Sequence, residues 1–362
     1  MSIGLPDINI IFRQKATTAI QRSQRGVAVV IVQDAKASTA RKQVYMYESE
    51  ISKEDYSDDT IKIIQRAFLV AVNKVYVITL PNEGKFDDAA ALLETTKYNY
   101  VCTTIDGMQQ ALANYVITKN SKSKGKKYMA VVANAGVTNS KYVIDVKNAT
   151  VTEKYGGSIP MVEYLPRITS ILANLPLDRS ITYYSFEDLT DVDTSFVSDE
   201  KSIDAWIDDG FLVLLRDEDE VLCGRGVNSL TEFTSTETED MRKIIIVESM
   251  NLIQDDIYTT FKKYYVGKYK NHLDRQNLFI SAVNSYFRDL AKEEILDPSY
   301  ENKAYIDVEA QRNAWTSVGK AEAADWSDDK VKQMSFKSKI FLRANVKILD
   351  AMEDLSFEIE ME

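Results

Sequence analysis

The first half of the chain alternates between apolar runs and amphipathic stretches. Four continuous apolar runs, rich in β-branched residues, are separated by segments whose apolar positions repeat at helical spacing. The predicted strands are Val27–Val32, Val75–Leu80, Tyr98–Ile105 and Tyr128–Ala133, with a further edge strand at Tyr142–Val146. One predicted helix begins after Asp58, and two further helices cover Phe86–Thr96 and Asp106–Thr118. This rhythm predicts an α/β fold with a mixed, mostly parallel sheet that helices cover on both faces.

The second half starts with a helix and ends with strands. The pattern predicts a helix at Met161–Leu175, which Pro176 ends, a strand at Ile181–Phe186, a helix around Ile203–Ile207 and a hairpin of Phe211–Arg216 with Val221–Val227. Two long amphipathic helices, Met241–Tyr265 and Arg275–Ile295, and a strand at Ile340–Leu349 follow. Because the texture changes near residue 240, we predict an α/β domain before it and an α+β unit of helices and strands after it.

Both ends of the chain have the alternation of a β-strand. Near the C-terminus, apolar residues alternate with polar ones at Leu355, Phe357, Ile359 and Met361. Near the N-terminus, Ile8, Ile10 and Phe12 alternate with Asn9, Ile11 and Arg13. A terminal strand with free amides requires a sheet edge. Two arrangements satisfy it: the ends pair within one folded subunit, or each subunit donates its ends to the sheets of its neighbours.

The charges of the two ends are complementary. Residues 1–26 carry Arg13, Lys15, Arg22 and Arg25 against one Asp, whereas residues 350–362 carry six acids, Glu358 and Glu360 among them, and no base. Acids two apart on one strand face repel each other unless cations lie opposite. We therefore hypothesise that the basic N-terminal arm and the acidic C-terminal arm pair across subunits.

Composition narrows the function classes. A net charge of −11 argues against broad binding to nucleic acid or to an anionic membrane. No stretch is long and apolar enough to span a membrane, and residues 1–26 lack the apolar core of a secretory signal, so we expect synthesis in a cytoplasm and no membrane insertion. Cys102 and Cys223 lie in apolar runs and are expected to be buried free thiols. The lysines of 119–127 are expected in a solvated loop, and the acids of 187–220 on a surface facing water.

A search for an active site yields no catalytic, cofactor-binding or metal-binding residue. His272 is the only histidine. The chain therefore lacks the residues for a metal site built from several histidines and for most acid–base triads. Gly224-Arg225-Gly226 supplies two of the three glycines of a dinucleotide fingerprint, in the context of a hairpin. Acid pairs such as Asp208 with Asp209 are interpreted as a solvated face. The alternative left open is a soluble α/β ligand-binding protein or enzyme that uses the acidic region 187–220.

Three stretches resemble contractile tail sheath proteins of myophage tails and R-type bacteriocins, in the short form found in Gram-positive bacteria. They are Gly4-Leu5-Pro6-Asp7-Ile8 through Gly26-Val27, Tyr164-Leu165-Pro166-Arg167-Ile168 through Ser180-Ile181-Thr182, and Phe341-Leu342-Arg343 through Asp354-Leu355. The resemblance covers both ends and the middle of the chain. It implies a structural protein without enzymatic activity or cofactor.

The resemblance also implies an organisation and a set of partners. Residues 1–26 would be an N-terminal strand arm, 27–240 an outward-facing α/β domain, 241–349 an α+β domain that faces an inner tube, and 350–362 a C-terminal strand arm. The subunit-interface residues would be Ile8, Ile10, Phe12, Arg13, Leu355, Phe357, Glu358, Ile359, Glu360 and Met361. The partners would be further copies of the chain in stacked rings, the inner tail tube protein, and baseplate and tail terminator proteins. The particle would be an extracellular phage tail or bacteriocin whose sheath contracts without a nucleotide.

Overall fold

A computed structural model describes residues 19–361 except 137 and 199–200. The predicted N-terminal anchors Ile8, Ile10, Phe12 and Arg13 therefore lie outside the described residues. The chain forms two compact units, and it passes between them three times. One unit comprises residues 23–258 and 348–362, and the other comprises residues 1–22 and 259–347. The division falls inside the helix α6 (Ile244–Tyr264).

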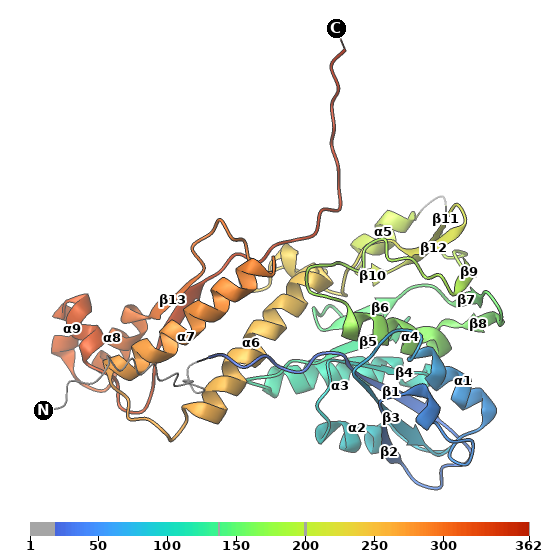
Figure 1. Cartoon of the computed structure of the whole chain (residues 1–362), viewed down its shortest axis with the longest axis horizontal. Helices are drawn as coiled ribbons and strands as arrows, with labels where there is room; N and C mark the ends of the chain where they lie inside the picture. The colour runs from blue at the N-terminus through green and yellow to red at the C-terminus, as the bar shows by residue number, and fades with distance from the viewer. Residues whose placement is uncertain (1–18, 137, 199–200, 362) are drawn as a thin grey trace, which may run out of the picture. The chain divides into compact units, whose positions relative to one another are not determined.

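The larger unit is built on a seven-stranded sheet in the order β10-β6-β5-β4-β1-β3-β2 (Figure 1). Its strands are β1 (Val27–Gln33), β2 (Arg41–Tyr45), β3 (Lys74–Leu80), β4 (Tyr100–Thr103), β5 (Met129–Ala133), β6 (Val143–Val146) and β10 (Phe211–Leu212). All neighbours pair in parallel except β2 and β3. The predicted mostly parallel α/β sheet is confirmed. Its two edge strands were not predicted: the antiparallel β2, and β10, whose residues the sequence pattern assigned to a hairpin.

Helices cover both faces of this sheet. On one face Val30 of β1 packs with α1 (Asp58–Arg66) and α4 (Met161–Asn174), and on the other Val29 packs with α2 (Phe86–Glu94) and α3 (Gln109–Lys122). Successive side chains of β1 point to opposite faces of the sheet and are buried on both. A parallel strand between two layers of helices is shielded from water on each face. The start of α1 follows from its sequence: the Ser57 hydroxyl accepts a hydrogen bond from the Thr60 amide, and two acids occupy the first turn.

Shorter antiparallel elements complete the larger unit. They are the three-stranded sheet β8-β7-β9 and the hairpin β11–β12, and the short helix α5 accompanies them. Their bounds are β7 (Thr150–Glu153), β8 (Gly157–Pro160), β9 (Leu189–Val192), α5 (Ile203–Asp208), β11 (Leu214–Asp217) and β12 (Glu220–Cys223), with 3-10 turns at Glu48–Glu50, Asp106–Met108 and Glu239–Arg242. The predicted charged hairpin is confirmed with shorter strands, whereas Phe211–Leu212, part of its predicted first strand, is β10 of the seven-stranded sheet. The predicted strand Ile181–Phe186 is wrong: Tyr183 has a positive φ of 55°, which breaks the extended run and leaves only an isolated bridge at Ser185.

The smaller unit combines helices with a two-stranded antiparallel sheet. It contains α7 (Leu273–Lys292), β13 (Lys303–Ile306), α8 (Val308–Ser317), a 3-10 turn (Ala321–Asp325), α9 (Asp328–Gln333) and β14 (Leu342–Asn345). The predicted apolar face of α7, which includes Phe279, Val283 and Phe287, is buried. The final strand is shorter than the predicted Ile340–Leu349. The segment of α8 and α9 has a small core of its own, in which Trp326 and Val331 pack with Trp315.

None of the helices in the described part of the chain has the length and apolar character that a membrane span requires. Both cysteines are buried and free, as predicted. Burial raises the pKa of both thiols, that of Cys102 to about 12. A buried protonated thiol is a poor nucleophile, so these residues serve as small apolar side chains.

Candidate assembly interface: the C-terminal arm and its clamp

The last residues of the chain form no secondary structure within one subunit. Residues 355–361, which we call the distal segment, run in Figure 1 as an extended trace without helix or strand. Their apolar side chains are exposed: Leu355 by 89%, Phe357 by 75%, Ile359 by 70% and Met361 by 92%. Among the described residues, no strand pairs with them. The alternation predicted from the sequence is therefore present as a pattern, but the described residues of the subunit offer it no strand partner.

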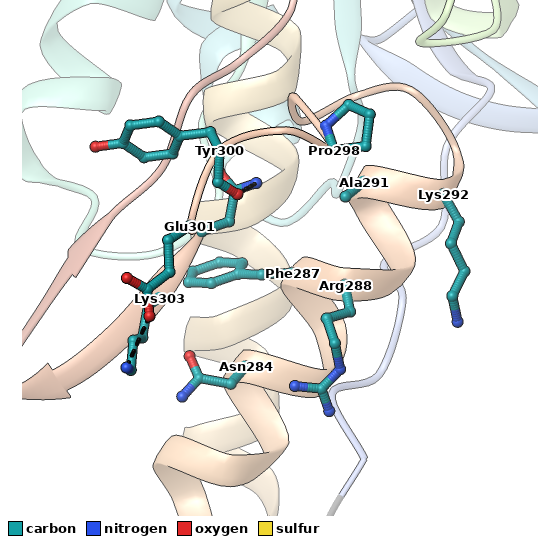
Figure 2. Close-up of a pocket in the computed structure, with 10 residues that line it drawn as sticks. Asn284, Phe287, Arg288, Ala291, Lys292, Pro298, Tyr300, Glu301 and Lys303 are labelled. Atoms are coloured by element: carbon teal, nitrogen blue, oxygen red, sulfur yellow. Dashed lines mark hydrogen bonds and ion pairs between the residues drawn. The ribbon is translucent and has the colours of Figure 1, made fainter.

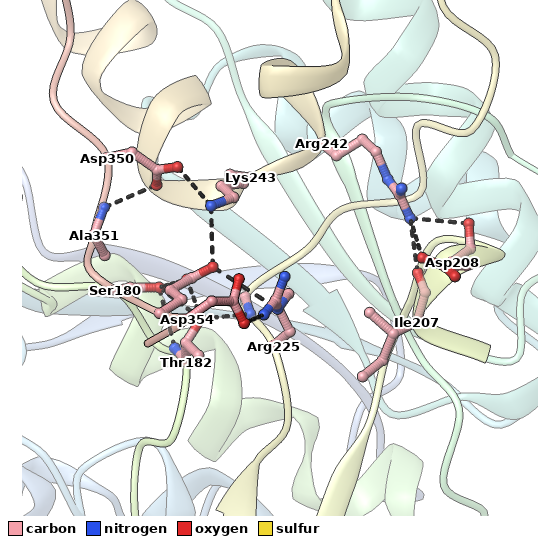
Figure 3. Close-up of polar contacts among 12 residues, drawn as sticks. Ser180, Thr182, Ile207, Asp208, Arg225, Arg242, Lys243, Asp350, Ala351 and Asp354 are labelled. Atoms are coloured by element: carbon pink, nitrogen blue, oxygen red, sulfur yellow. Dashed lines mark hydrogen bonds and ion pairs between the residues drawn. The ribbon is translucent and has the colours of Figure 1, made fainter. Parts of the chain in front are cut away.

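Directly before the distal segment, the chain is fixed to the larger unit by acidic side chains. Asp350 bonds Lys243 Nζ at 2.5 Å, and Asp354 bonds Arg225 Nη2 at 2.5 Å (Figure 3). Between them, Glu353 is held by both bases, with its Oε2 3.1 Å from Lys243 Nζ and 3.8 Å from Arg225 Nε. We call these residues, together with Ser180 and Thr182, the C-terminal clamp.

Glu353 is the centre of the clamp. Its side chain is only 4% exposed. The Thr182 hydroxyl donates to its Oε1 at 2.6 Å, and the Ser180 hydroxyl lies 3.3 Å from the same oxygen. A buried carboxylate is stable only when cations and hydrogen-bond donors surround it. Hydroxyls surround Oε1, and two bases lie within ion-pair distance of Oε2, which accepts no hydrogen bond from the described residues.

Electrostatics in the clamp favour the charged forms of its bases. Burial alone would lower the pKa of Lys243, but the carboxylates of Glu353 and Asp350 outweigh it and raise the pKa. The hydrogen bond with Asp354 raises the pKa of Arg225. Both bases therefore stay charged across the physiological pH range, and ion pairing fixes the start of the distal segment.

Glycine explains how Thr182 reaches Glu353. The Gly226 amide donates to the Thr182 hydroxyl at 2.9 Å. A Cβ at Gly226 would lie 2.9 Å from the Ile181 side chain, closer than real Cβ contacts come, and 3.1 Å from the Ser180 hydroxyl, tighter than most of them. The Gly224-Arg225-Gly226 stretch thus supplies close approach and a cation after β12, in the hairpin context that the sequence indicated.

The clamp revises part of the charge argument from the sequence. Three of the six C-terminal acids are neutralised within their own subunit, whereas Glu358 and Glu360 lie outside the clamp. On the N-terminal side, Arg22 bonds Glu293 at 2.7 Å and Arg25 bonds Glu248 at 3.0 Å. The cations available for pairing between arms are accordingly fewer than the composition indicated.

Other regions that the sequence singled out are explained by local contacts. In the lysine-rich loop, Lys119 donates to the Leu93 carbonyl and lies 4.7 Å from the ring centre of Tyr128, and Lys126 pairs with Asp255 at 3.3 Å. The expectation of a wholly solvated loop was therefore wrong, and it holds only for Lys122 and Lys124.

The acid pair Asp208 and Asp209 also has local partners. Asp209 bonds Lys201, and Asp208 lies 3.7 Å from Arg242. Among the described residues, no group of three or more histidines, cysteines or acids is arranged to hold a metal ion. His272 precedes α7 as its N-cap residue and has an exposed side chain.

The smaller unit presents a strand edge. In the sheet β13–β14, Lys303 pairs with Asn345, Ala304 with Ala344, Tyr305 with Arg343 and Ile306 with Leu342. Beside β13 lies a groove of about 500 Å³, lined by apolar and basic side chains of α7 and of the segment before β13 (Figure 2). β14 is half-buried at Leu342 and exposed at its other three residues. A strand with a free, exposed edge can accept a further strand.

Comparison with known proteins finds similar chains in one protein family. Residues 236–362 match the phage tail sheath C-terminal domain. A tail sheath protein of Clostridium phage phiCD119 is 31% identical over 372 residues, and the alignment covers 99% of this chain and 99% of that protein.

Solved structures share the fold. The sheath tail protein of Desulfitobacterium hafniense matches with a TM-score of 0.68 at 15% identity, over 83% of this chain and 94% of that one. The sheath tail protein Lin1278 of Listeria innocua matches with a TM-score of 0.66 at 11% identity, over 93% and 98%. The helical sheath of the anti-feeding prophage in its contracted state matches with a TM-score of 0.69 at 11% identity, over the whole of both chains.

Proposed function

Because the chain belongs to the tail sheath protein family, we propose that its subunits polymerise into a contractile sheath by exchanging their C-terminal strands. The chain is a structural subunit of a contractile tail, and the particle is a phage tail or a related extracellular contractile particle. The observation that supports strand exchange is the distal segment, which exposes four apolar side chains in strict alternation and has no strand partner among the described residues.

The acceptor in this proposal is the β13–β14 sheet of a second subunit. A donated strand would gain backbone hydrogen bonds along the edge, and its apolar side chains would cover apolar positions of the sheet. The donor lies in the larger unit and the acceptor in the smaller one, so the contact is heterologous. A heterologous contact that does not close on itself propagates into a helical array.

The wider role follows from the same family membership. We propose that the sheath assembles in its extended form around the inner tail tube protein in the bacterial cytoplasm, between baseplate and tail terminator proteins. Contraction would release a kinetically trapped packing, in which subunits move while the exchanged strands keep them connected. That mechanism requires no catalysis by the chain. The N-terminal arm, with Ile8, Ile10, Phe12 and Arg13, would add a second exchanged strand.

The test is a truncation that removes the distal segment and spares the clamp. A chain that ends after Asp354 retains Asp350, Glu353 and their partners, and the removed residues 355–361 make no hydrogen bond or ion pair within the described subunit. Electron microscopy of the full chain, with and without the tail tube protein, should show rings or tubes. The truncated chain should unfold at the same temperature and remain monomeric.

A second variant separates the apolar anchors from chain length. Phe357→Ser with Ile359→Ser keeps the backbone and the acids but removes two of the four apolar side chains, and it should also block assembly. Ser356→Ala, on the opposite face of the segment, is the matched control and should assemble normally. Tubes formed as readily by the truncated chain as by the full chain would rule out exchange of the C-terminal strand.

A further inference from the structure

The β13–β14 sheet has two outer edges, and the edge of β13 is already occupied at Ala304. The Ala304 amide donates to Asn284 Oδ1 at 2.7 Å, and Asn284 Nδ2 donates to the Ala304 carbonyl at 3.2 Å. The primary amide of Asn284, which projects from α7 (Figure 2), thus makes the same pair of hydrogen bonds that a neighbouring strand would make. The backbone of β13 at Ala304 is closed to a further strand.

The edge of β14 is open. In an antiparallel pair, residues opposite each other point their backbone groups either toward one another or both outward. Ala304 points outward to Asn284, so its partner Ala344 also points outward, on the far side of β14. The same alternation applies to Leu342 opposite Ile306. Among the described residues, no hydrogen bond reaches the outward backbone groups of Ala344 or Leu342.

Apolar cover is also missing on the β14 side. Ala304 and Ile306 on β13 are buried, with exposures of 4% and 6%. Their partners on the same face of the sheet are less covered: Ala344 is exposed and Leu342 is half-buried. A strand added beside β14 would place apolar side chains next to these two residues. The alternation of the distal segment has the period that this face requires.

Charge identifies the strand that fits. Residues 334–347, which include β14, carry four bases and no acid. Arg343 pairs with Asp307 at 3.2 Å and Lys347 with Asp297 at 2.8 Å, so the charge available to an added strand comes from Lys337 and Lys339. Residues 355–362 carry three acids and no base. Opposite charges attract the two segments and oppose addition of a basic strand. A second copy of this chain therefore supplies a partner with both the required alternation and the required charge.

The β13 side would attract the same segment if its edge were free. The groove there is lined by the apolar Phe287, Ala291 and Pro298, and its rim carries Arg288, Lys292 and Lys303, of which Lys292 pairs with Asp289 and Lys303 with Glu301. An acidic, apolar strand that entered this groove would occupy the wrong edge and alter the geometry of the polymer. Blocking that edge is a common way in which proteins restrict strand addition.

We propose that the distal segment of a second copy adds to β14, and that Asn284 confines it there by closing β13. This inference rests on the proposed strand exchange and adds the acceptor edge and the residue that selects it. Asn284 acts as a specificity residue for assembly.

Cysteine cross-linking in assembled sheaths distinguishes the two edges. Ser356→Cys in the distal segment is combined with Asn345→Cys or Arg343→Cys on β14, or with Tyr305→Cys or Lys303→Cys on β13, all four on the face that Ser356 would share. A strand added at β14 lies about 5 Å from β14 and about 10 Å from β13, and a disulfide requires Cα atoms within about 7 Å. The native cysteines are buried and do not compete. We expect disulfide-linked dimers with β14 and at least tenfold fewer with β13.

Asn284→Ala tests the selecting residue. It frees both backbone groups of Ala304, and the ratio of β13 to β14 cross-links should rise at least tenfold. Asn277→Ala, an exposed asparagine on the same helix, is the matched control and should leave the ratio unchanged. If Asn284→Ala does not fold, Asn284→Asp retains the acceptor for the Ala304 amide and repels its carbonyl, and it should raise the ratio by a smaller factor.

The outcomes separate this inference from the proposed function. Tubes whose distal segments cross-link to β13 in the unsubstituted background would overturn the edge assignment and leave strand exchange intact. Tubes that cross-link at neither edge would overturn both. An unchanged ratio in every Asn284 variant that folds would show that another feature selects the edge.

Discussion

The C-terminal clamp makes a quantitative prediction for Lys243. Lys243→Ala removes the ion pairs with Asp350 and Glu353, and it leaves the buried Glu353 carboxylate with the hydroxyl of Thr182 and a more distant Arg225. Hydrogen bonds to charged groups contribute about 1.5–3 kcal/mol each. Because the Lys243 side chain is 26% exposed, solvent screens part of this contribution. We therefore assign about 1 kcal/mol to each of the two ion pairs. The clamp should then open about 30-fold more often, since 1.4 kcal/mol corresponds to a factor of ten.

Protease cleavage at the clamp measures that opening. Glutamyl endopeptidase should remove the exposed end after Glu360 and Glu358 in all variants, because these residues lie in the distal segment. Cleavage after Glu353 requires the clamp to open, and when opening is fast its rate follows the open population. Mass spectrometry of the intact products should show cleavage after Glu353 roughly 30-fold faster in Lys243→Ala.

Two comparisons decide whether the reasoning is correct. Lys97→Ala changes an exposed lysine of the same unit outside the clamp and should leave both cleavages as they are in the unsubstituted chain. Raising the salt concentration should accelerate cleavage after Glu353 in the unsubstituted chain more than in Lys243→Ala, because salt screens the pairs that the variant lacks. Equal rates after Glu353 in Lys243→Ala and the unsubstituted chain would refute the role of the clamp.

Two further predictions concern the larger unit. Burial raises the pKa of Asp145 from 3.8 to about 7, so the unfolded chain loses this proton near pH 4 while the folded chain keeps it to near pH 7, and stability falls as pH rises between these values. Asp145→Asn should remove that fall in stability. Above pH 7 it should raise the free energy of unfolding by up to about 4 kcal/mol, and at pH 4 it should raise it little. Denaturant titrations that give the free energy of unfolding the same pH dependence in both proteins would contradict this. Gly125→Ala should cost about 1–3 kcal/mol in thermal unfolding because its Cβ would overlap the ring of Tyr258, whereas Gly107→Ala, with open space around it, should cost little.

The parallel core could be predicted because its signal is local. Each central strand is a short β-branched run that must be apolar on both faces, as in Val27–Gln33. The edge strand β2 escaped prediction because it is only partly buried, and its residues Arg41, Lys42 and Gln43 read as a polar loop. Burial at an edge depends on neighbours that a single segment does not encode.

The clamp could not be predicted because its parts are far apart in the sequence. Lys243 and Asp350 are separated by 107 residues, and Thr182 and Glu353 by 171. The pattern of Ile181–Phe186 favoured a strand, whereas Tyr183 has a left-handed backbone and the hydroxyls of Ser180 and Thr182 lie beside Glu353. The composition did show an acidic C-terminus, but it could not show that half of those acids are neutralised in place.

A single exchanged strand is marginally stable, and this bears on how a sheath can be built. Burial of the four apolar side chains of the distal segment contributes roughly 6–12 kcal/mol in total. Ordering the seven backbone residues 355–361 costs about 7–14 kcal/mol. The two terms nearly cancel, so one link provides little net affinity and free subunits remain soluble. In a ring or a helix each subunit both donates and accepts, and after the first contact further links form at a high effective concentration. Because the clamp fixes the start of the distal segment at Asp354, it limits the span that this segment must search and so favours the later links.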